Sequence, residues 1–153
     1  YNKRHGFSLA GEDKVYTSGT ERVIIEYKGW RICPQICYDL RFPVWARNTD
    51  NYDVLLYVAN WPKPRITAWD TLLKARAIEN MSYCIGVNRV GLDANNYEYP
   101  GHSAVYDVLG KKLTRENSNK ETIEMITLSK SHIEINRRHL GFLNDRDSFN
   151  LTV

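Results

Sequence analysis

The sequence predicts a mixed α/β protein in which amphipathic helices cover a face of a sheet. Near-continuous apolar runs at 53–59 and 82–88 are typical of strands that are covered on both faces. Between these runs, residues 65–80 repeat apolar side chains at helical spacing. With 153 residues, the chain is long enough for one domain with a sizeable core.

Strands and helices follow one another along the whole chain. In order, we expect strands at 23–27 and 30–36, a short helix at 42–47, a strand at 53–59, a helix at 65–80, strands at 82–88, 103–108, 112–113 and 121–128, and a helix at 129–138. Lys28-Gly29 predicts a tight turn between the first two strands. Pro43 suits the first turn of a helix, and Pro62 breaks the chain after the third strand.

The second half of the chain depends on weaker signals. The polar stretch at 91–101 predicts a loop, and the turn at 109–111 joins two short strands as a hairpin. Apolar and polar residues alternate in 121–128, which predicts a final strand. Ser129 is a good N-cap for the last helix.

The composition argues against several classes of function. Lys and Arg number 21 against 18 Asp and Glu, and the signs are interspersed, so we expect no nucleic-acid partner. No apolar run approaches the roughly 18–20 residues that span a bilayer, so we expect no membrane partner. Three cysteines without zinc-ligand spacing indicate a reduced, cytoplasmic protein. Because the first residue is Tyr1 rather than Met, we expect a fragment or a lost beginning.

Cys37 stands where the sequence predicts a ligand-binding crevice. It ends a strand in "ICPQICYDLRFP", directly before a turn into the short helix. Strand ends in layered α/β proteins face such a crevice, and free N–H groups at a helix start lower the pKa of a thiol. We therefore expect a reactive thiolate here. Period 2 places Cys33 on the same face but deeper, and Cys84 fits the core.

The cysteine pattern alone leaves other interpretations open. A buried core role for Cys37 is the simpler interpretation of a lone cysteine, because such motifs transfer poorly between families. A cysteine protease would need a histidine close to the thiol. Residues His102, His132 and His139 are available, but their surroundings in the sequence are undistinguished. The protease hypothesis is therefore weak.

Five sequence blocks stand in a distinctive order and spacing. "YNKRHGFSLAGE" is followed by "ICYDLRFPVWAR", "YVANWPKPR", "LLKARAIEN" and "GVNRVG". Together they resemble the nitrilase superfamily of carbon–nitrogen hydrolases, and within its amidase branch the omega-amidases. That family hydrolyses the terminal amide of 2-oxo dicarboxylate monoamides. The resemblance implies an αββα layered sandwich, of which residues 1–153 would be the C-terminal portion of a single domain, with the N-terminal portion not covered.

The resemblance also implies a Cys-Glu-Lys site that needs no metal or organic cofactor. By motif, Cys37 would be the nucleophile and Lys3 the catalytic lysine. Glu12 would be a second acidic residue that positions both, and the backbone N–H of Tyr38 would help to stabilise the oxyanion. In the family, the glutamate that serves as general base lies well upstream of the lysine motif. That base is therefore absent from residues 1–153.

The implied substrate is a small amide that carries a carboxylate. Arg41 or Arg65 would bind that carboxylate through a bidentate fork, while Asn60 and Trp61 would line the pocket with Tyr38. Structural alternatives remain for these residues. Trp61 also fits a core position, and Asp39 with Arg41 would then pair with each other or with neighbours to fix the turn.

Three hypotheses about function stay open. The first is hydrolysis of an amide of the 2-oxoglutaramate or 2-oxosuccinamate type to acid and ammonia through a cysteine thioester. The second keeps the chemistry but changes the substrate to an N-carbamoyl compound or another amide. A nitrile is disfavoured, because the nitrilase branch resembles Cys-Trp-Glu where this chain has Cys37-Tyr38-Asp39. The third is an inactive fragment or assembly module, and in all three we expect residues 131–150 to pack across a homodimer.

Overall fold

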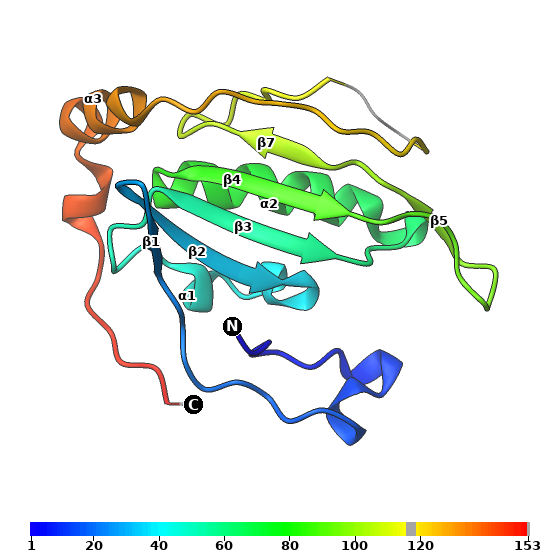
Figure 1. The fold of residues 1–153 in the computed structure, drawn as a ribbon. Helices are drawn as coiled ribbons and strands as arrows, with labels where there is room; N and C mark the ends of the chain where they lie inside the picture. Colours follow the sequence, from blue (N-terminus) through cyan, green and yellow to red (C-terminus); the bar gives the residue numbers. More distant parts are fainter. Residues whose placement is uncertain (116–118, 153) are drawn as a thin grey trace.

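The computed structural model describes residues 1–115 and 119–152 and has a five-stranded mixed sheet at its centre (Figure 1). In spatial order the strands are β1 (Ile25–Tyr27), β2 (Trp30–Ile36), β3 (Val54–Ala59), β4 (Tyr83–Asn88) and β7 (Ala104–Tyr106). The three central strands run parallel, and β1 and β7 flank them in antiparallel orientation. The mixed α/β class predicted from the sequence is confirmed.

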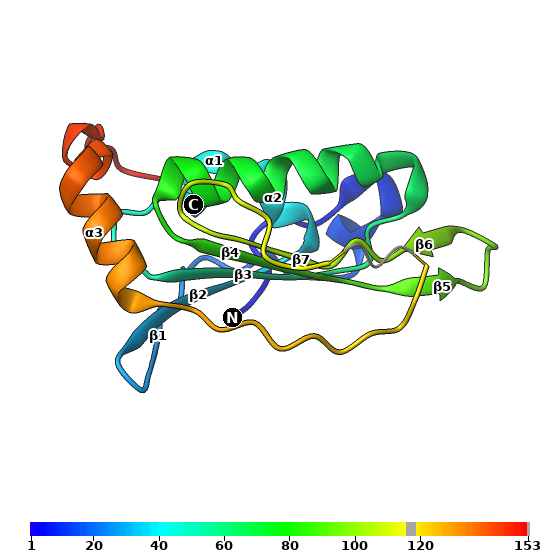
Figure 2. The ribbon, with the colours of Figure 1, turned by 90° about the horizontal axis from the view of Figure 1, so that it is seen from above.

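The helices between the parallel strands lie on one face of the sheet. α1 (Pro43–Ala46) follows β2, and α2 (Ile66–Asn80) crosses from β3 to β4 along that face (Figure 2). Gly86 on β4 permits this close packing, because a Cβ atom there would lie 2.4 Å from Leu73 Cδ1 of α2. The predicted first hairpin and the helices predicted at 42–47 and 65–80 are confirmed.

Two hydrophobic clusters cover different parts of the sheet. The cluster under α2 includes Cys33 and Cys84, both fully buried as the sequence predicted. The second cluster lies against the other face and includes Ile133 of α3 (Lys130–Leu140). Val58 and Val87, at the far ends of β3 and β4, remain 48% and 50% exposed. The described residues thus supply one helix layer and one sheet of the expected αββα sandwich.

The prediction that 91–101 is a plain loop is wrong. The stretch contains most of an antiparallel hairpin of β5 (Val90–Leu92) and β6 (Glu98–Pro100). The Asp93 carboxylate accepts the N–H groups of Asn95 and Tyr97 at 2.8 and 3.0 Å, so it holds the tip of the hairpin. The hairpin projects beyond the main sheet, so its strands are polar. They therefore lack the apolar pattern from which a strand is predicted.

The prediction of a strand at 121–128 is also wrong. These residues are extended but form no ladder with another described segment. Ile123 and Met125 are 100% and 94% exposed, whereas Ile126 and Leu128 pack against the second cluster. Apolar residues therefore lie on both sides of this segment, and only the side with Ile126 and Leu128 lies against the protein. The strand expected at 112–113 likewise reduces to a single bridge between Lys112 and Tyr106.

The last helix begins where the sequence predicted. The hydroxyl oxygen of Ser129 accepts the backbone N–H of His132 at 3.2 Å and caps α3. The helix ends at Gly141, which has a left-handed backbone with φ of 69°. In residues 1–115 and 119–152, no helix combines the length and the apolar character that crossing a bilayer requires.

Candidate active site

The parallel strands β2, β3 and β4 end at the same edge of the sheet, and a cavity of about 1270 Å³ lies there. Its wall includes Cys37 after β2, Asn60 after β3 and Asn88 at the end of β4. The irregular N-terminal segment also lines the cavity. Ligands of open α/β sheets bind at such an edge.

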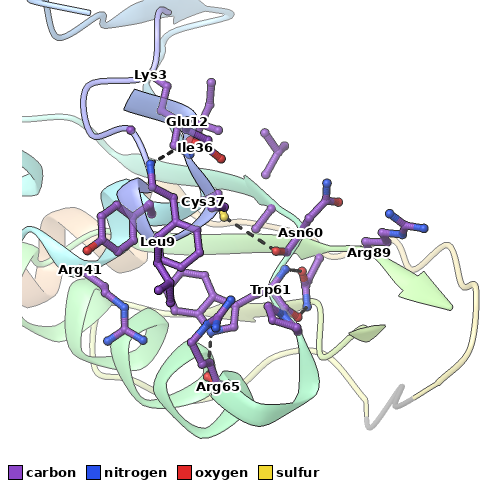
Figure 3. Close-up of a pocket in the computed structure, with 18 of the residues that line it drawn as sticks. Lys3, Leu9, Glu12, Ile36, Cys37, Arg41, Asn60, Trp61, Arg65 and Arg89 are labelled. Atoms are coloured by element: carbon purple, nitrogen blue, oxygen red, sulfur yellow. Dashed lines mark hydrogen bonds and ion pairs between the residues drawn. The ribbon is translucent and has the colours of Figure 1, made fainter. Parts of the chain in front are cut away.

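All eight residues that the sequence analysis proposed for the site line this cavity. They are Lys3, Glu12, Cys37, Tyr38, Arg41, Asn60, Trp61 and Arg65. Figure 3 shows Cys37 between the segment that carries Lys3 and Glu12 and the strand end at Asn60. The fold thus brings residues from distant parts of the chain into one place. Their individual roles stay predictions.

Cys37 has an unusual backbone conformation. Its φ of 47° lies in the left-handed region, which residues other than glycine seldom adopt. Strain of this kind concentrates at functional sites, where the surrounding structure holds it in place. Cys37 also opens the 3₁₀ turn η3 (Cys37–Arg41), and its Sγ lies 4.0 Å from the carbonyl oxygen of Asn60. The bend carries the thiol out of the strand to the cavity wall.

The expectation of a lowered thiol pKa at Cys37 is wrong. Burial raises the pKa of Cys37 above its ordinary value of 9.0, and the nearby Lys3 charge opposes this shift only in part. The residue stands at a five-residue 3₁₀ turn rather than at the start of a long helix, so a helix dipole contributes little. A thiol with a raised pKa is protonated near neutral pH and needs a base before it can attack.

Lys3 and Glu12 form an ion pair on the cavity wall. The Glu12 carboxylate also accepts the backbone N–H of Phe7 at 2.9 Å. Burial acts to raise the pKa of Glu12, but the hydrogen bonds from Lys3 and Phe7 outweigh it and lower the pKa. The carboxylate is therefore ionised at neutral pH and holds the ammonium group of Lys3 in place.

Asp39 joins the N-terminal segment to the turn that carries Cys37. Its fully buried carboxylate accepts the Tyr1 hydroxyl at 2.9 Å and the His5 backbone N–H at 3.0 Å. The sequence analysis expected Asp39 to pair either with Arg41 or with other neighbouring residues, and the structure shows the second arrangement. No ion pair joins Asp39 to Arg41 in the part of the chain that the structure describes.

Arg41 and Arg65 are placed by aromatic rings. The guanidinium carbon of Arg41 lies 5.1 Å from the ring centroid of Trp61, and that of Arg65 lies 5.0 Å from the centroid of Phe7. Cation–π contacts of this kind orient a guanidinium without neutralising it. Among the described residues neither arginine forms an ion pair, so both charges can act on an anion in the cavity. Trp61 itself is only 3% exposed and belongs largely to the core.

Sequence reasoning missed many residues of the cavity wall, among them Asn88, Phe7 and Arg89. The Asn88 side chain accepts the Trp61 N–H at 2.7 Å and donates to the carbonyls of Trp61 and Gly101 at 3.0 and 2.7 Å, which fixes the loop after β3. Its place at the end of a parallel strand was the signal that could have found it. Phe7 and Arg89 also line the cavity. Both stand in blocks that carry the family resemblance, which was the signal that could have found them.

The thiols and the acidic side chains show no sign of a metal centre within the described ranges, 1–115 and 119–152. No group of three or more His, Cys, Asp or Glu residues there is arranged to hold a metal ion. Cys33, Cys37 and Cys84 are all free thiols. At the cavity, this part of the chain presents a thiol, an ammonium–carboxylate pair and guanidinium groups.

Several proteins of known sequence that resemble this chain are named as amidases. The chain is 47% identical over 149 residues to an omega-amidase, YafV, from Yersinia enterocolitica, an alignment that covers 97% of this chain and 58% of the relative. It is 39% identical over 125 residues to a 2-oxoglutaramate amidase from Bacillus subtilis, which covers 80% of this chain and 48% of the relative. The chain therefore spans less than two thirds of either relative.

A solved structure and a family model lead to the same group. A CN-hydrolase superfamily protein from Xanthomonas campestris, with an arsenic adduct in its active site, superposes with a TM-score of 0.96 and 44% identity. The superposition covers 99% of this chain and 60% of that protein. Residues 1–137 match the model of the carbon-nitrogen hydrolase family. The chain therefore belongs to the carbon–nitrogen hydrolase family.

Proposed function

We propose that the intact protein hydrolyses the terminal amide of a small carboxylate-bearing amide, of the 2-oxoglutaramate or 2-oxosuccinamate type, to the acid and ammonia. The observation that carries this proposal is the meeting, at one cavity, of Cys37, the Lys3–Glu12 pair and the guanidinium groups of Arg41 and Arg65, which form no ion pair among the described residues. A thiol beside an ammonium suits covalent attack on an amide, and a guanidinium suits a carboxylate. The names of the relatives describe the same chemistry.

The first chemical step forms a thioester. A general base takes the proton of Cys37, and the sulfur bonds to the amide carbon. The Lys3 ammonium and the Tyr38 backbone N–H would stabilise the negative oxygen that results. The C–N bond then breaks, and the proton passes from the base to the departing nitrogen, which leaves as ammonia. The raised pKa of the Cys37 thiol supports a mechanism with a separate base.

The second step releases the acid. The same base takes a proton from water, and the water oxygen bonds to the thioester carbon. The C–S bond breaks, the acid leaves, and the sulfur recovers its proton from the base. Each bond change is carried by side chains and water alone.

The base would come from an N-terminal portion that precedes Tyr1 in the intact protein. Residues 1–153 would then be the C-terminal portion of a single domain, and the N-terminal portion would cover the open sheet face around Val58 and Val87. The relatives support this, because the chain spans only 58% and 48% of their lengths. The intact mass tests it: an active native protein of 17.8 kDa would contradict the proposal and favour a different base.

The substrate carboxylate would bind to Arg41 or Arg65, with Asn60 and Trp61 in the pocket wall. Because both guanidinium groups are already oriented by aromatic rings, binding would immobilise little additional side chain. Arg41→Lys keeps the charge but loses the planar fork, so we expect a higher KM with a similar kcat for a carboxylate-bearing amide. An equal change in KM for an amide without a carboxylate would contradict this role.

The protein would act as a homodimer in the cytoplasm. Ile135 on α3 and Phe142 after it are 61% and 55% exposed, which supports an interface on α3 and the tail, within residues 131–150. Light scattering that shows a stable monomer would rule this interface out. The three free thiols agree with a reducing compartment.

The decisive experiment measures ammonia release from 2-oxoglutaramate by the intact protein. Cys37→Ala should reduce the rate on the order of 10⁴-fold or more, because the bond-forming atom is lost. Cys33→Ala is the matched control, since this thiol lies on β2, four residues before Cys37, but is fully buried, and the rate of this variant should stay near wild type. Equal release by wild type and Cys37→Ala would overturn the mechanism, and a preference for an N-carbamoyl compound would change the substrate.

A further inference from the structure

We propose that Asp39 is a positioning residue, which sets the place of Lys3 relative to Cys37 by clamping residues 1–5 onto the turn η3. The inference rests on the proposed function, in which the Lys3 charge acts on the thiol and on the oxyanion. Asp39 touches neither the sulfur nor the cavity and would act through Lys3. It is a different residue from Glu12, which pairs with Lys3 directly.

The carboxylate of Asp39 is saturated with donors. One oxygen accepts the His5 backbone N–H at 3.0 Å and lies 2.8 Å from His5 Nδ1. The other oxygen accepts the Tyr1 hydroxyl at 2.9 Å and the Ile36 backbone N–H at 3.1 Å. Burying a carboxylate is costly unless such donors satisfy it. With the side chain fully buried, these four contacts fix both oxygens in one orientation.

The two residues of the N-terminal segment that contact Asp39 lie on either side of Lys3 in the sequence. Tyr1 and His5 stand two residues before and two residues after Lys3, and residues 1–7 form neither helix nor strand. No backbone ladder therefore places Lys3. Its backbone oxygen accepts the N–H of Gly19 at 2.8 Å, but Gly19 belongs to another irregular segment. Asp39, by contrast, is itself part of η3, which begins at the nucleophile Cys37.

Asp39 makes more contacts than the turn η3 alone requires. A carboxylate that only closed the turn would need the single bond to the Ile36 N–H, because that bond joins the turn to the strand end. The remaining three contacts come from residues 1–5, the segment that carries Lys3. Its anchors are themselves held in place: the His5 ring stacks on Phe42 at 3.6 Å, and the Tyr1 oxygen accepts the Trp45 indole N–H at 2.9 Å.

The test follows the alkylation rate of Cys37 by iodoacetamide against pH in the intact protein. Lys3→Met should raise the midpoint by about 1 pH unit, because a nearby cation stabilises the thiolate. Asp39→Asn should also raise it, although removal of the Asp39 charge by itself would lower it, since that carboxylate raises the pKa of Cys37. An upward shift therefore reports displacement of Lys3. An unchanged or lowered midpoint would overturn the proposal.

The double variant decides whether Asp39 acts through Lys3. Asp39→Asn combined with Lys3→Met should shift the midpoint no further than Lys3→Met alone, whereas additive shifts would show an independent role and contradict the proposal. If Asp39→Asn does not fold, as judged by circular dichroism, Tyr1→Phe removes one donor to the carboxylate and should give a smaller upward shift. No shift with that variant would count against the clamp. Peptide mapping confirms the alkylated site.

Activity separates this inference from the proposed function. In the intact enzyme, Asp39→Asn should lower kcat about 10- to 100-fold with a KM within about twofold, as expected for misplacement of a group that acts in the transition state. A raised KM with unchanged kcat would contradict the positioning role. If wild type hydrolyses no amide but the alkylation shifts appear, the proposed function fails and the clamp stands. If hydrolysis occurs without those shifts, only the clamp fails.

Discussion

Two buried aspartates tie remote segments to opposite edges of the sheet. At the carboxyl edge, Asp39 is 0% exposed and holds residues 1–5 through a hydroxyl, an amide and an imidazole. At the amino edge, Asp53 is 5% exposed and lies 3.1 Å from the Lys130 ammonium and 3.7 Å from the Arg137 guanidinium of α3. Both carboxylates also accept a backbone N–H from β2 or its end.

The difference lies in what each segment brings with it. The segment at Asp53 is a capped helix, whose own hydrogen bonds keep its shape, and Asp53 does not line the cavity. The segment at Asp39 is irregular and carries Lys3, and the aspartate stands two residues after Cys37. Similar burial therefore has different consequences. Asp53 should contribute to stability, whereas Asp39 should contribute to the geometry of the site.

The largest expected effect is at the carboxyl edge. Lys3→Met should lower the rate of amide hydrolysis by roughly 10²–10³-fold, because the proposed mechanism uses the Lys3 ammonium as one donor to the oxyanion. Lys130→Met is the matched control, since it removes the same kind of group from the amino edge, where Lys130 pairs with Asp53. Ammonia release measured on both variants checks the comparison. A comparable loss in both would mean that the two edges are not functionally distinct.

The next effect concerns stability at the amino edge. Asp53→Asn should reduce the free energy of unfolding by about 1–3 kcal/mol, because the Arg31 N–H, Lys130 and Arg137 lose a charged acceptor. Urea denaturation of the intact protein measures this change. The activity of the molecules that remain folded should be unaltered. A fall in kcat at unchanged stability would reverse the assignment.

A smaller effect is expected at the start of α3. Ser129→Ala removes the hydroxyl that accepts the His132 N–H, so the free energy of unfolding should fall by about 1 kcal/mol. Ser129→Asp, which keeps a capping oxygen, should restore most of the loss. The same urea titration compares the variants, and equal stability of Ala and Asp would exclude a capping role.

The smallest effect tests the pair between Lys130 and Asp53. The Lys130 side chain is 42% exposed, so water screens its charge. Lys130→Met should therefore change the free energy of unfolding by less than about 1 kcal/mol, and the change should shrink in high salt. A larger, salt-independent loss would show that the pair behaves as a buried one.

The sequence predicted the parts of the fold that depend on local pattern. The runs at 53–59 and 82–88 and the helix at 65–80 carry strong periodicity, and the Ser129 cap is a local hydrogen bond. The hairpin of β5 and β6 was missed because its strands are short and polar. The segment 121–128 was assigned wrongly because alternation reports an extended backbone but not a partner strand.

The site was predicted through motifs, and its electrostatics were not. The order of the sequence blocks led to Lys3 and Cys37, which the fold brings to one cavity. The thiol pKa was predicted in the wrong direction, because burial depends on residues from several distant segments. The partners of Asp39 could not be predicted either, since Tyr1 and His5 lie more than thirty positions away in the chain.

The left-handed backbone at Cys37 restricts which residues can replace it. Asparagine, serine and alanine tolerate this conformation far better than valine, isoleucine or threonine, whose branched side chains make it a severe outlier. In a saturation library at position 37, side-chain shape should therefore decide first which variants fold, and reactivity should decide only then which of them are active. Folded but inert proteins would come from the compact residues, and insoluble ones from the branched residues.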